Sequence, residues 1–284
     1  MNKSKTSDIS NLIRMVFGKK IPRHFTSAVI VAAGSSERMG GDTPKQFINI
    51  CGAPVVVRTL LAYEKCDSIH EIVIVCREGD AQRYEEFREK YGITKLGAIV
   101  VGAETRQMSV VKGLEAVSDK TEFVAIADAA RCLTTPEMIS EVCRQAYRYD
   151  AATAATKAVD SIKRVKKGFV EESIPRNEVW LAQTPQVFRI NLYRAAAYNA
   201  IENGRKATDD NELVEAIGRT VMVVECGKDN FKLTSPEDLY LAEVIIKMRT
   251  DAEEKKKPEG ISGDKVVDTD GDELPKEPAD RKGD

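Results

Sequence analysis

Short apolar runs alternate with longer segments of mixed polarity over most of the chain. The apolar runs have the length and the Val, Ile and Ala content expected of strands buried on both faces of a sheet. They cover residues 27–33, 71–76, 97–101, 123–127 and 151–155. The segments between them have helical spacing and cover residues 54–65, 80–91, 105–117 and 136–149, with Asp80 as a candidate N-cap. This alternation predicts an α/β fold with a mainly parallel sheet and helices on both faces.

The pattern changes after residue 157. Residues 161–174 alternate apolar and polar positions around Gly168, which predicts a two-stranded hairpin. A lone hairpin is marginally stable in water, so we expect this β-arm, about residues 157–181, to pack against a second subunit. Further helices are predicted at 191–203, 209–217 and 236–249, and a strand at 221–225.

The two ends of the chain differ from the core at residues 26–250. In residues 1–25, apolar side chains recur at helical spacing and basic residues follow, which predicts a basic amphipathic extension. We expect it to dock on the protein's own body or on a partner rather than on a membrane surface. Residues 251–284 carry 12 acidic and 7 basic residues and no aromatic residue, so we expect a disordered, charged tail.

Composition narrows the possible classes of function. The net charge of −2 argues against a nucleic-acid-binding protein, and no apolar run reaches the roughly 18 residues of a membrane span. The six cysteines are widely spaced and form no CxxC pair, as expected for reduced, mostly buried thiols of a cytoplasmic protein. The chain contains two histidines, which argues against a His-rich zinc site.

The loop after the first predicted strand is the first candidate site. Its small residues Ala32, Ala33 and Gly34 let backbone N–H groups approach phosphate oxygens closely. Arg38 and Lys45 add two cations to the same loop. The loop matches neither the G-x4-G-K-[ST] pattern nor the G-x-G-x-x-G pattern. A phosphate-binding loop and an ordinary turn with solvated charges are therefore both open at this point.

Asp128, directly after the strand at 123–127, is the second candidate. A carboxylate in this position suits a divalent metal, because Mg2+ is commonly bound by one or two carboxylates together with substrate phosphates. The alternative is that Asp128 caps the turn that follows it.

Several motifs in order resemble the 2-C-methyl-D-erythritol 4-phosphate cytidylyltransferase family, over about residues 26–247. These motifs are Ala32-Ala-Gly34 with Arg38-Met39 and Pro44-Lys-Gln46, Asp128-Ala-Ala-Arg131, Thr184-Pro-Gln186, and Asp229-Asn-Phe-Lys232 with Pro236-Glu-Asp238. The resemblance implies a Rossmann-like α/β fold with a protruding β-arm, working as a homodimer. It implies transfer of CMP from CTP to 2-C-methyl-D-erythritol 4-phosphate, in the non-mevalonate route to isoprenoids.

The resemblance also implies roles for individual residues. Catalytic cations are implied at Arg38, Lys45 and Lys232. Nucleotide contacts are implied at Ala32, Ala33, Gly34, Gly102, Arg106, Ser109 and Ala129. Asp128 matches the ligand of Mg2+ or another divalent cation. Contacts with the sugar-alcohol phosphate are implied at Ser161, Arg176, Asp229 and Lys232, with Ser161 and Arg176 reaching from the β-arm into the partner subunit's site.

Two positions depart from the family pattern His-Asp-Ala-Ala-Arg-Pro, because Ala127 replaces the His and Cys132 replaces the Pro. Asp128 and Arg131 are retained, so we expect an active enzyme whose metal loop is supported differently.

Two alternative functions stay open. One is a ribitol-5-phosphate cytidylyltransferase, which performs the same chemistry on a pentitol phosphate, and the other is a nucleotide-binding regulator without turnover.

Overall fold

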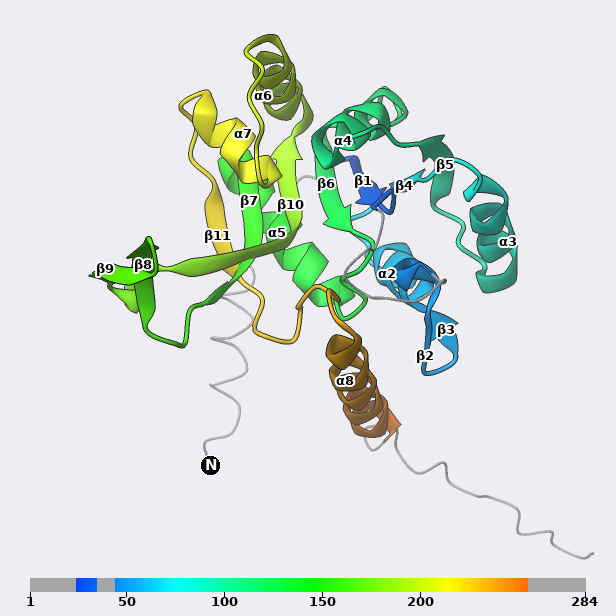
Figure 1. Ribbon diagram of the computed structural model, residues 1–284. Coiled ribbons are helices and arrows are strands. Elements are labelled where there is room, and N and C mark those ends of the chain that lie inside the picture. Colours follow the sequence, from blue (N-terminus) through cyan, green and yellow to red (C-terminus); the bar gives the residue numbers. More distant parts are fainter. Residues whose placement is uncertain (1–23, 35–43, 255–284) are drawn as a thin grey trace, which may run out of the picture.

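A seven-stranded sheet forms the centre of the molecule in the computed structural model, which describes residues 24–34 and 44–254 (Figure 1). The strand order is β11-β7-β10-β6-β1-β4-β5. These strands are β1 (Thr26–Val31), β4 (Glu71–Cys76), β5 (Leu96–Val101), β6 (Phe123–Asp128), β7 (Ala151–Lys157), β10 (Trp180–Arg189) and β11 (Met222–Glu225). Two-residue strands β2 (Asn49–Ile50) and β3 (Ala53–Pro54) form a separate ribbon. The predicted extension at 1–25 lies outside the described residues except for its last two positions.

Strand directions confirm the prediction of a mainly parallel sheet. Neighbouring strands are parallel in the pairs β1 and β4, β1 and β6, β4 and β5, and β7 and β11. β10 runs antiparallel to both of its neighbours, β6 and β7. The carboxyl ends of β1, β5 and β6 therefore meet at one edge of the sheet, where open α/β sheets bind ligands.

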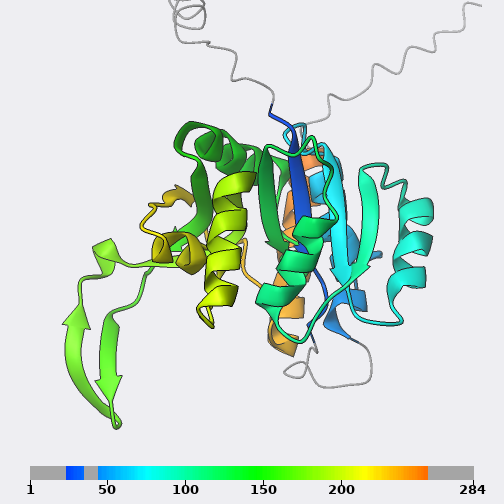
Figure 2. The ribbon, with the colours of Figure 1, turned by 90° about the horizontal axis from the view of Figure 1, so that it is seen from above.

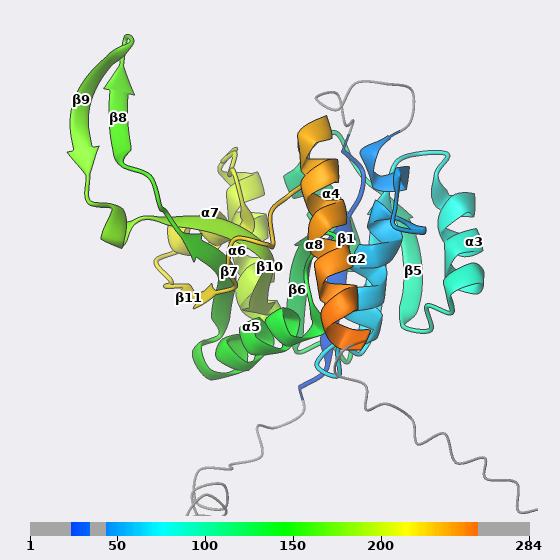
Figure 3. The ribbon, with the colours of Figure 1, turned by 90° about the horizontal axis from the view of Figure 1, so that it is seen from below.

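Helices cover both faces of the sheet, as the alternation of elements predicts. The helices are α2 (Val55–Glu64), α3 (Ala81–Tyr91), α4 (Arg106–Glu115), α5 (Pro136–Tyr149), α6 (Ile190–Glu202), α7 (Asp210–Ala216) and α8 (Pro236–Glu254), with short 3-10 turns η2 (Lys45–Phe47) and η3 (Arg176–Glu178). Figure 2 shows α4, α6 and α7 on one face, and Figure 3 shows α2, α5 and α8 on the other. Alternate residues of β1 divide between the two cores: Ile30 packs with the α2 and α5 side, and Val29 with the α4 and α6 side.

The structure differs from the sequence prediction in several elements. The short ribbon of β2 and β3 was not predicted, and the first strand ends at Val31 rather than at Ala33. β10 was not predicted at all. Asp80 precedes α3 but caps it with no side-chain hydrogen bond, because its carboxylate pairs with Arg77 at 2.9 Å instead. α8 continues to Glu254, so the expected tail at 251–284 is wrong for its first four residues, and the rest of it lies outside the described residues.

The predicted hairpin forms the β-arm, made of β8 (Ile162–Lys166) and β9 (Phe169–Ile174), and it projects away from the body (Figure 3). Lys167 and Gly168 at its tip both have positive φ, which matches the twist of a two-residue hairpin turn. Val165, Phe169 and Val170 are 57%, 79% and 62% exposed. The arm therefore presents apolar surface that the described part of this chain does not cover.

The state of the cysteines agrees with the sequence prediction. All six cysteines are free thiols and five of them are buried. Across residues 24–34 and 44–254, no helix has both the length and the apolar character needed to cross a membrane.

Candidate active site

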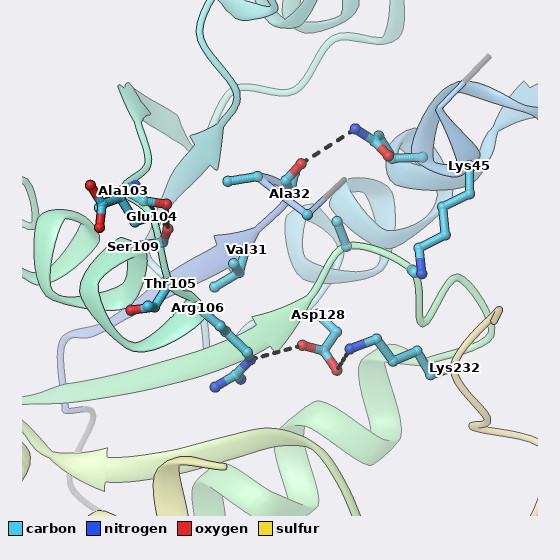
Figure 4. A pocket seen from close by; sticks show the side chains of 15 residues that line it. Val31, Ala32, Lys45, Ala103, Glu104, Thr105, Arg106, Ser109, Asp128 and Lys232 are labelled. Carbon is cyan, nitrogen blue, oxygen red and sulfur yellow. Dashed lines mark hydrogen bonds and ion pairs between the residues drawn. The ribbon is translucent and has the colours of Figure 1, made fainter. Parts of the chain in front are cut away.

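A pocket of about 720 Å3 lies at the carboxyl ends of β1, β5 and β6 (Figure 4). It is the place where the structure brings most of the predicted site residues together. Those that line it are Ala32, Ala33, Gly34, Lys45, Arg106, Ser109, Asp128, Ala129 and Lys232. Of the other predicted residues, Gly102 lies directly behind the wall of the pocket, as its contacts show, and Arg38 belongs to residues 35–43, outside the described part of the chain.

The loop after β1 supplies one wall of the pocket. The N–H of Ala32 donates to the carbonyl of Val75 at 2.7 Å, which ties the start of the loop to β4. The buried side chain of Gln46 donates from Nε2 to the carbonyl of Ala32 at 3.3 Å. Gln46 was not predicted as a site residue beyond its place in the motif, and it joins the two ends of the loop. The structure therefore anchors the backbone of Ala32 from both sides.

Asp128 is the electrostatic centre of the pocket. It is the last residue of β6, and its N–H donates to Thr184 Oγ1 on β10 at 3.1 Å. Its carboxylate lies 3.1 Å from Lys232 Nζ, 3.3 Å from Arg106 Nε and 3.6 Å from Arg131 Nε. Burial alone would raise the pKa of Asp128, but these cations outweigh burial and hold the pKa at about 2. The carboxylate is thus ionised at any physiological pH.

The helix α4 forms the opposite wall and begins at Arg106. Thr105 is its N-cap and accepts a hydrogen bond from the N–H of Met108 at 3.1 Å. Ser109 Oγ accepts from the N–H of Ala103 at 3.0 Å, so the first turn of the helix is joined to the end of β5. A Cβ on Gly102 would come within 2.7 Å of the Ala33 Cβ, so a glycine is needed for these two walls to meet.

Lys45 and Lys232 approach Asp128 from the third side of the pocket (Figure 4). Lys45 begins η2, and its Nζ donates to the carbonyl of Leu233 at 3.1 Å. The two lysines therefore come from segments nearly 190 residues apart and meet at one place. Three cations among the lining residues, with Arg106 as the third, make the pocket suitable for a polyanion.

Asn230 fixes the loop that carries Lys232. It is fully buried, and its Nδ2 donates to Gln183 Oε1 at 3.0 Å and to the carbonyl of Thr184 at 2.9 Å. Its Oδ1 accepts from Thr134 Oγ1 at 2.7 Å. The sequence placed Asn230 in a family motif, but nothing in its local pattern showed that it would be buried among three segments.

The remaining predicted residues lie outside the pocket of their own chain. Ser161 and Arg176 are exposed at the base of the β-arm, and Arg176 Nη1 donates to the carbonyl of Val159 at 2.9 Å. Asp229 was expected beside Lys232, but it does not line the pocket, and its carboxylate lies 3.6 Å from Arg249 Nη2 on α8. Lys232 pairs with Asp128 in the pocket, whereas Asp229 pairs with α8, so the structure does not bring these two predicted residues together.

Ala127 and Cys132, the two departures from the family pattern, are both buried in the apolar interior. Ala127 is buried on β6 and pairs in register with Ile30 of β1. Cys132 packs in an apolar cluster with Ile50 and Leu233, and burial raises the pKa of its thiol to about 11. Neither substitution displaces Asp128 from the pocket.

The fold and the pocket define a class of protein. A loop of small residues, one ionised carboxylate and several cations at the carboxyl ends of parallel strands are the parts that bind nucleotide phosphates and stabilise their transfer. This is the arrangement of a nucleotidyltransferase.

Comparison with known proteins identifies the family. The family model for 2-C-methyl-D-erythritol 4-phosphate cytidylyltransferase matches residues 26–248. Proteins of that name from Geobacillus kaustophilus and Pelotomaculum thermopropionicum are 39% and 40% identical to this chain, over 78% of it and over 97% and 94% of their own lengths. The chain belongs to the 2-C-methyl-D-erythritol 4-phosphate cytidylyltransferase family, and it is a cytidylyltransferase of the non-mevalonate route to isoprenoids.

Solved structures agree with this assignment. The crystal structure of 4-diphosphocytidyl-2C-methyl-D-erythritol synthase from Anaerococcus prevotii superposes with a TM-score of 0.72 at 29% identity, over 80% of this chain and 98% of that one. The enzyme from Thermus thermophilus superposes with a TM-score of 0.65 at 31% identity, over 78% and 99%. The Rossmann-like fold predicted from the resemblance is thereby confirmed.

Proposed function

We propose that the pocket around Asp128 binds CTP beside 2-C-methyl-D-erythritol 4-phosphate and catalyses their condensation. The observation that carries this proposal is the meeting of Lys45, Lys232 and Arg106 around one ionised carboxylate at the carboxyl ends of β1, β5 and β6. The small residues Ala32 to Gly34 form the nucleotide side of the pocket, with Ser109 and the backbone around Ala129.

The reaction joins two anions, so its main requirement is charge compensation. A phosphate oxygen of the acceptor forms a bond to the α-phosphorus of CTP, and the bond from that phosphorus to the bridging oxygen breaks. Pyrophosphate leaves with the electron pair. The nucleophile is already an anion, and therefore no general base is needed. In this proposal Lys45 stabilises the charge on the α-phosphate and pyrophosphate, and Lys232 holds the incoming phosphate.

We propose Mg2+ or another divalent cation as the cofactor, held by Asp128. The donor set fits this role, because an ionised carboxylate lines the pocket and a nucleotide would bring the phosphate oxygens that Mg2+ prefers. The described residues contain no group of three or more metal-ligating side chains, so most ligands would come from the nucleotide and water. When bound, the ion would neutralise phosphate charge.

The Asp128→Asn variant tests this role. It keeps the shape of the side chain and removes its charge. We expect activity to collapse and the half-saturating Mg2+ concentration to rise. The matched control is Asp150→Asn, which changes an exposed carboxylate paired with Arg189 far from the pocket. Identical Mg2+ saturation curves for Asp128→Asn and the parent would exclude Asp128 as the ligand.

We also propose that the active form is a cytoplasmic homodimer joined through the β-arm. The exposed side chains Val165, Phe169 and Val170 support this, since an apolar hairpin is stable only when it is covered. Ser161 and Arg176 at the base of the arm lie outside their own pocket, as a role in the partner subunit's site requires.

An initial-rate matrix tests the reaction itself. Each of CTP, UTP, ATP and GTP is combined with 2-C-methyl-D-erythritol 4-phosphate and with ribitol 5-phosphate, and pyrophosphate release is followed. The expected result is turnover with CTP and the methylerythritol phosphate. Preference for ribitol 5-phosphate would make the chain a pentitol-phosphate cytidylyltransferase, and binding of CTP without pyrophosphate release would make it a regulator.

A further inference from the structure

A second carboxylate, that of Asp210, contacts the pocket residue Arg106 without lining the pocket itself. Asp210 is the first residue of α7 and is 1% exposed. Its Oδ2 lies 2.7 Å from Nη1 of Arg106, whereas the contact of Arg106 with Asp128 is 3.3 Å. Arg106 is therefore shared between two carboxylates, and the shorter contact is the one with Asp210. Asp210 does not cap α7, because Asp209 does so by accepting from the N–H of Glu212 at 3.1 Å.

The surroundings of Asp210 keep its carboxylate in one position. Tyr193 donates from its hydroxyl to Asp210 Oδ1, and the ring of Tyr193 stacks on Phe188 of β10 with centroids 5.0 Å apart. The N–H of Asp210 donates to Gln186 Oε1 at 3.0 Å. A rigid chain of contacts thus runs from β10 through Tyr193 and Asp210 to Arg106.

A buried carboxylate is costly unless it is paired and hydrogen-bonded. Burial raises the pKa of Asp210, and Arg106 and Tyr193 oppose that rise. The pairing also matters for Arg106, whose guanidinium is a rigid fork with a preferred direction for each donor. Without Asp210, its nearest anion among the contacts of the described structure would be Asp128. The guanidinium would then turn toward the carboxylate that the chemistry uses.

We propose that Asp210 is a positioning residue that holds Arg106 in the orientation required to bind CTP. This inference rests on the proposed function, in which Arg106 belongs to the nucleotide side of the pocket. It assigns a role in nucleotide affinity to a buried residue that does not line the pocket. The role differs from a contribution to stability alone, because it acts through one side chain and on one of the two substrates.

A double-mutant cycle tests the inference. The variants are Asp210→Asn, Arg106→Gln and the two combined, with Asp150→Asn as the remote control. Loss of a partner that orients a metal ligand typically costs about 10–100-fold, and by the same logic we expect Asp210→Asn to raise the KM for CTP about tenfold or more. The KM for the sugar-alcohol phosphate should change less than about twofold. Asp210→Asn should add nothing further to Arg106→Gln.

Tyr193→Phe is a second variant in case Asp210→Asn does not fold. It removes the hydroxyl that orients Asp210 and leaves the ring in place. We expect a smaller rise in the KM for CTP, which again disappears in the Arg106→Gln background. Equal rises in both KM values, or additive effects of the Asp210 and Arg106 substitutions, would overturn the inference.

The same cycle can be measured on the Kd of CTP by titration calorimetry, which needs no turnover. A parent that binds CTP without reacting would refute the proposed reaction, while the coupling between Asp210 and Arg106 would still be measured. A parent that reacts normally but shows no coupling would refute only the role of Asp210.

Discussion

Lys45 is the lysine of the pocket that follows the loop after β1. Its Nζ contacts the carbonyl of Leu233 and stands near Asp128, so it contributes charge to the site and little to the core (Figure 4). We expect Lys45→Ala to fold normally and to lose on the order of 10²–10³ in kcat, the usual cost of one charge-stabilising donor. Steady-state kinetics with thermal melting measures both. The control is Lys120→Ala, at an exposed position before β6. Retention of more than about half the activity would remove Lys45 from the site.

The ionisation of Asp128 links the pocket to acid stability. Its pKa is lowered from 3.8 to about 2 in the folded protein. A group with a depressed pKa stabilises the fold above its unfolded pKa, and this contribution is lost as the pH falls through the folded pKa. We expect the difference in unfolding free energy between the parent and Asp128→Asn to shrink by about 2 kcal/mol between pH 4 and pH 2. Urea titrations across this range measure it, and a constant difference would contradict the prediction.

At the scale of elements, hydrophobic pattern was a good guide to most of the sheet and its helices. β4 and α5 have the predicted bounds, because an apolar run or an amphipathic period fills each of them from end to end. β10 was not predicted from the sequence, because Gln183, Thr184 and Pro185 interrupt its apolar pattern and a proline argues against a central strand. The pairing of β10 with β7 shifts register between Ala182 and Gln186, so the ladder accommodates the proline there.

The close approach of α4 to the sheet depends on Gly113. A Cβ at this position would lie 2.4 Å from Val29 Cγ1 and 2.9 Å from Val75 Cγ2. Alanine is the better helix former by about 1 kcal/mol, but overpacking a core costs about 1–3 kcal/mol. We therefore expect Gly113→Ala to destabilise the protein by about 1 kcal/mol. We also expect it to raise the KM for CTP, because a shift of α4 would displace Arg106 and Ser109, which belong to the same helix.

Urea denaturation and kinetics measure the two effects of Gly113→Ala. Glu115→Ala, at an exposed position of the same helix, is the control and should change stability by less than about 0.5 kcal/mol. A Gly113→Ala protein more stable than its parent would show that the sheet yields to the added methyl group.

At the scale of the whole molecule, the sequence predicted which charges would meet but not what holds them there. Loops at the carboxyl ends of parallel strands converge by topology, which is why Lys45 and Asp128 could be placed in one site from their positions after strands. Asp210 and Asn230 could not be found in this way. Their roles arise from burial between segments far apart in the chain. Asp210 lies at a helix start, where an Asp looks like an ordinary cap, and the local pattern around Asn230 does not show its burial.

The β-arm gives the last prediction, which concerns how two chains build one site. Arg176 lies at the base of the arm, outside its own pocket, whereas Lys45 and Lys232 line that pocket. If the arm crosses to the other subunit, a heterodimer of Arg176→Ala and Lys45→Ala chains has one site with both lesions and one with neither. Random mixing makes about half of the dimers heterodimers, so about a quarter of the parental activity should return when the two inactive variants exchange subunits.

Lys45→Ala mixed with Lys232→Ala is the matched control for this experiment. Both residues belong to the same pocket of the same chain, so every site in that mixture carries at least one lesion and no activity should return. Subunit exchange is followed independently with a fluorescent label on each variant. Complete exchange of the Arg176→Ala and Lys45→Ala chains without recovered activity would show that Arg176 does not complete the partner subunit's site. Recovery in the mixture of Arg176→Ala and Lys45→Ala, and not in the control mixture, would establish that the exposed arm is part of the catalytic unit. In that case no single chain contains a whole site.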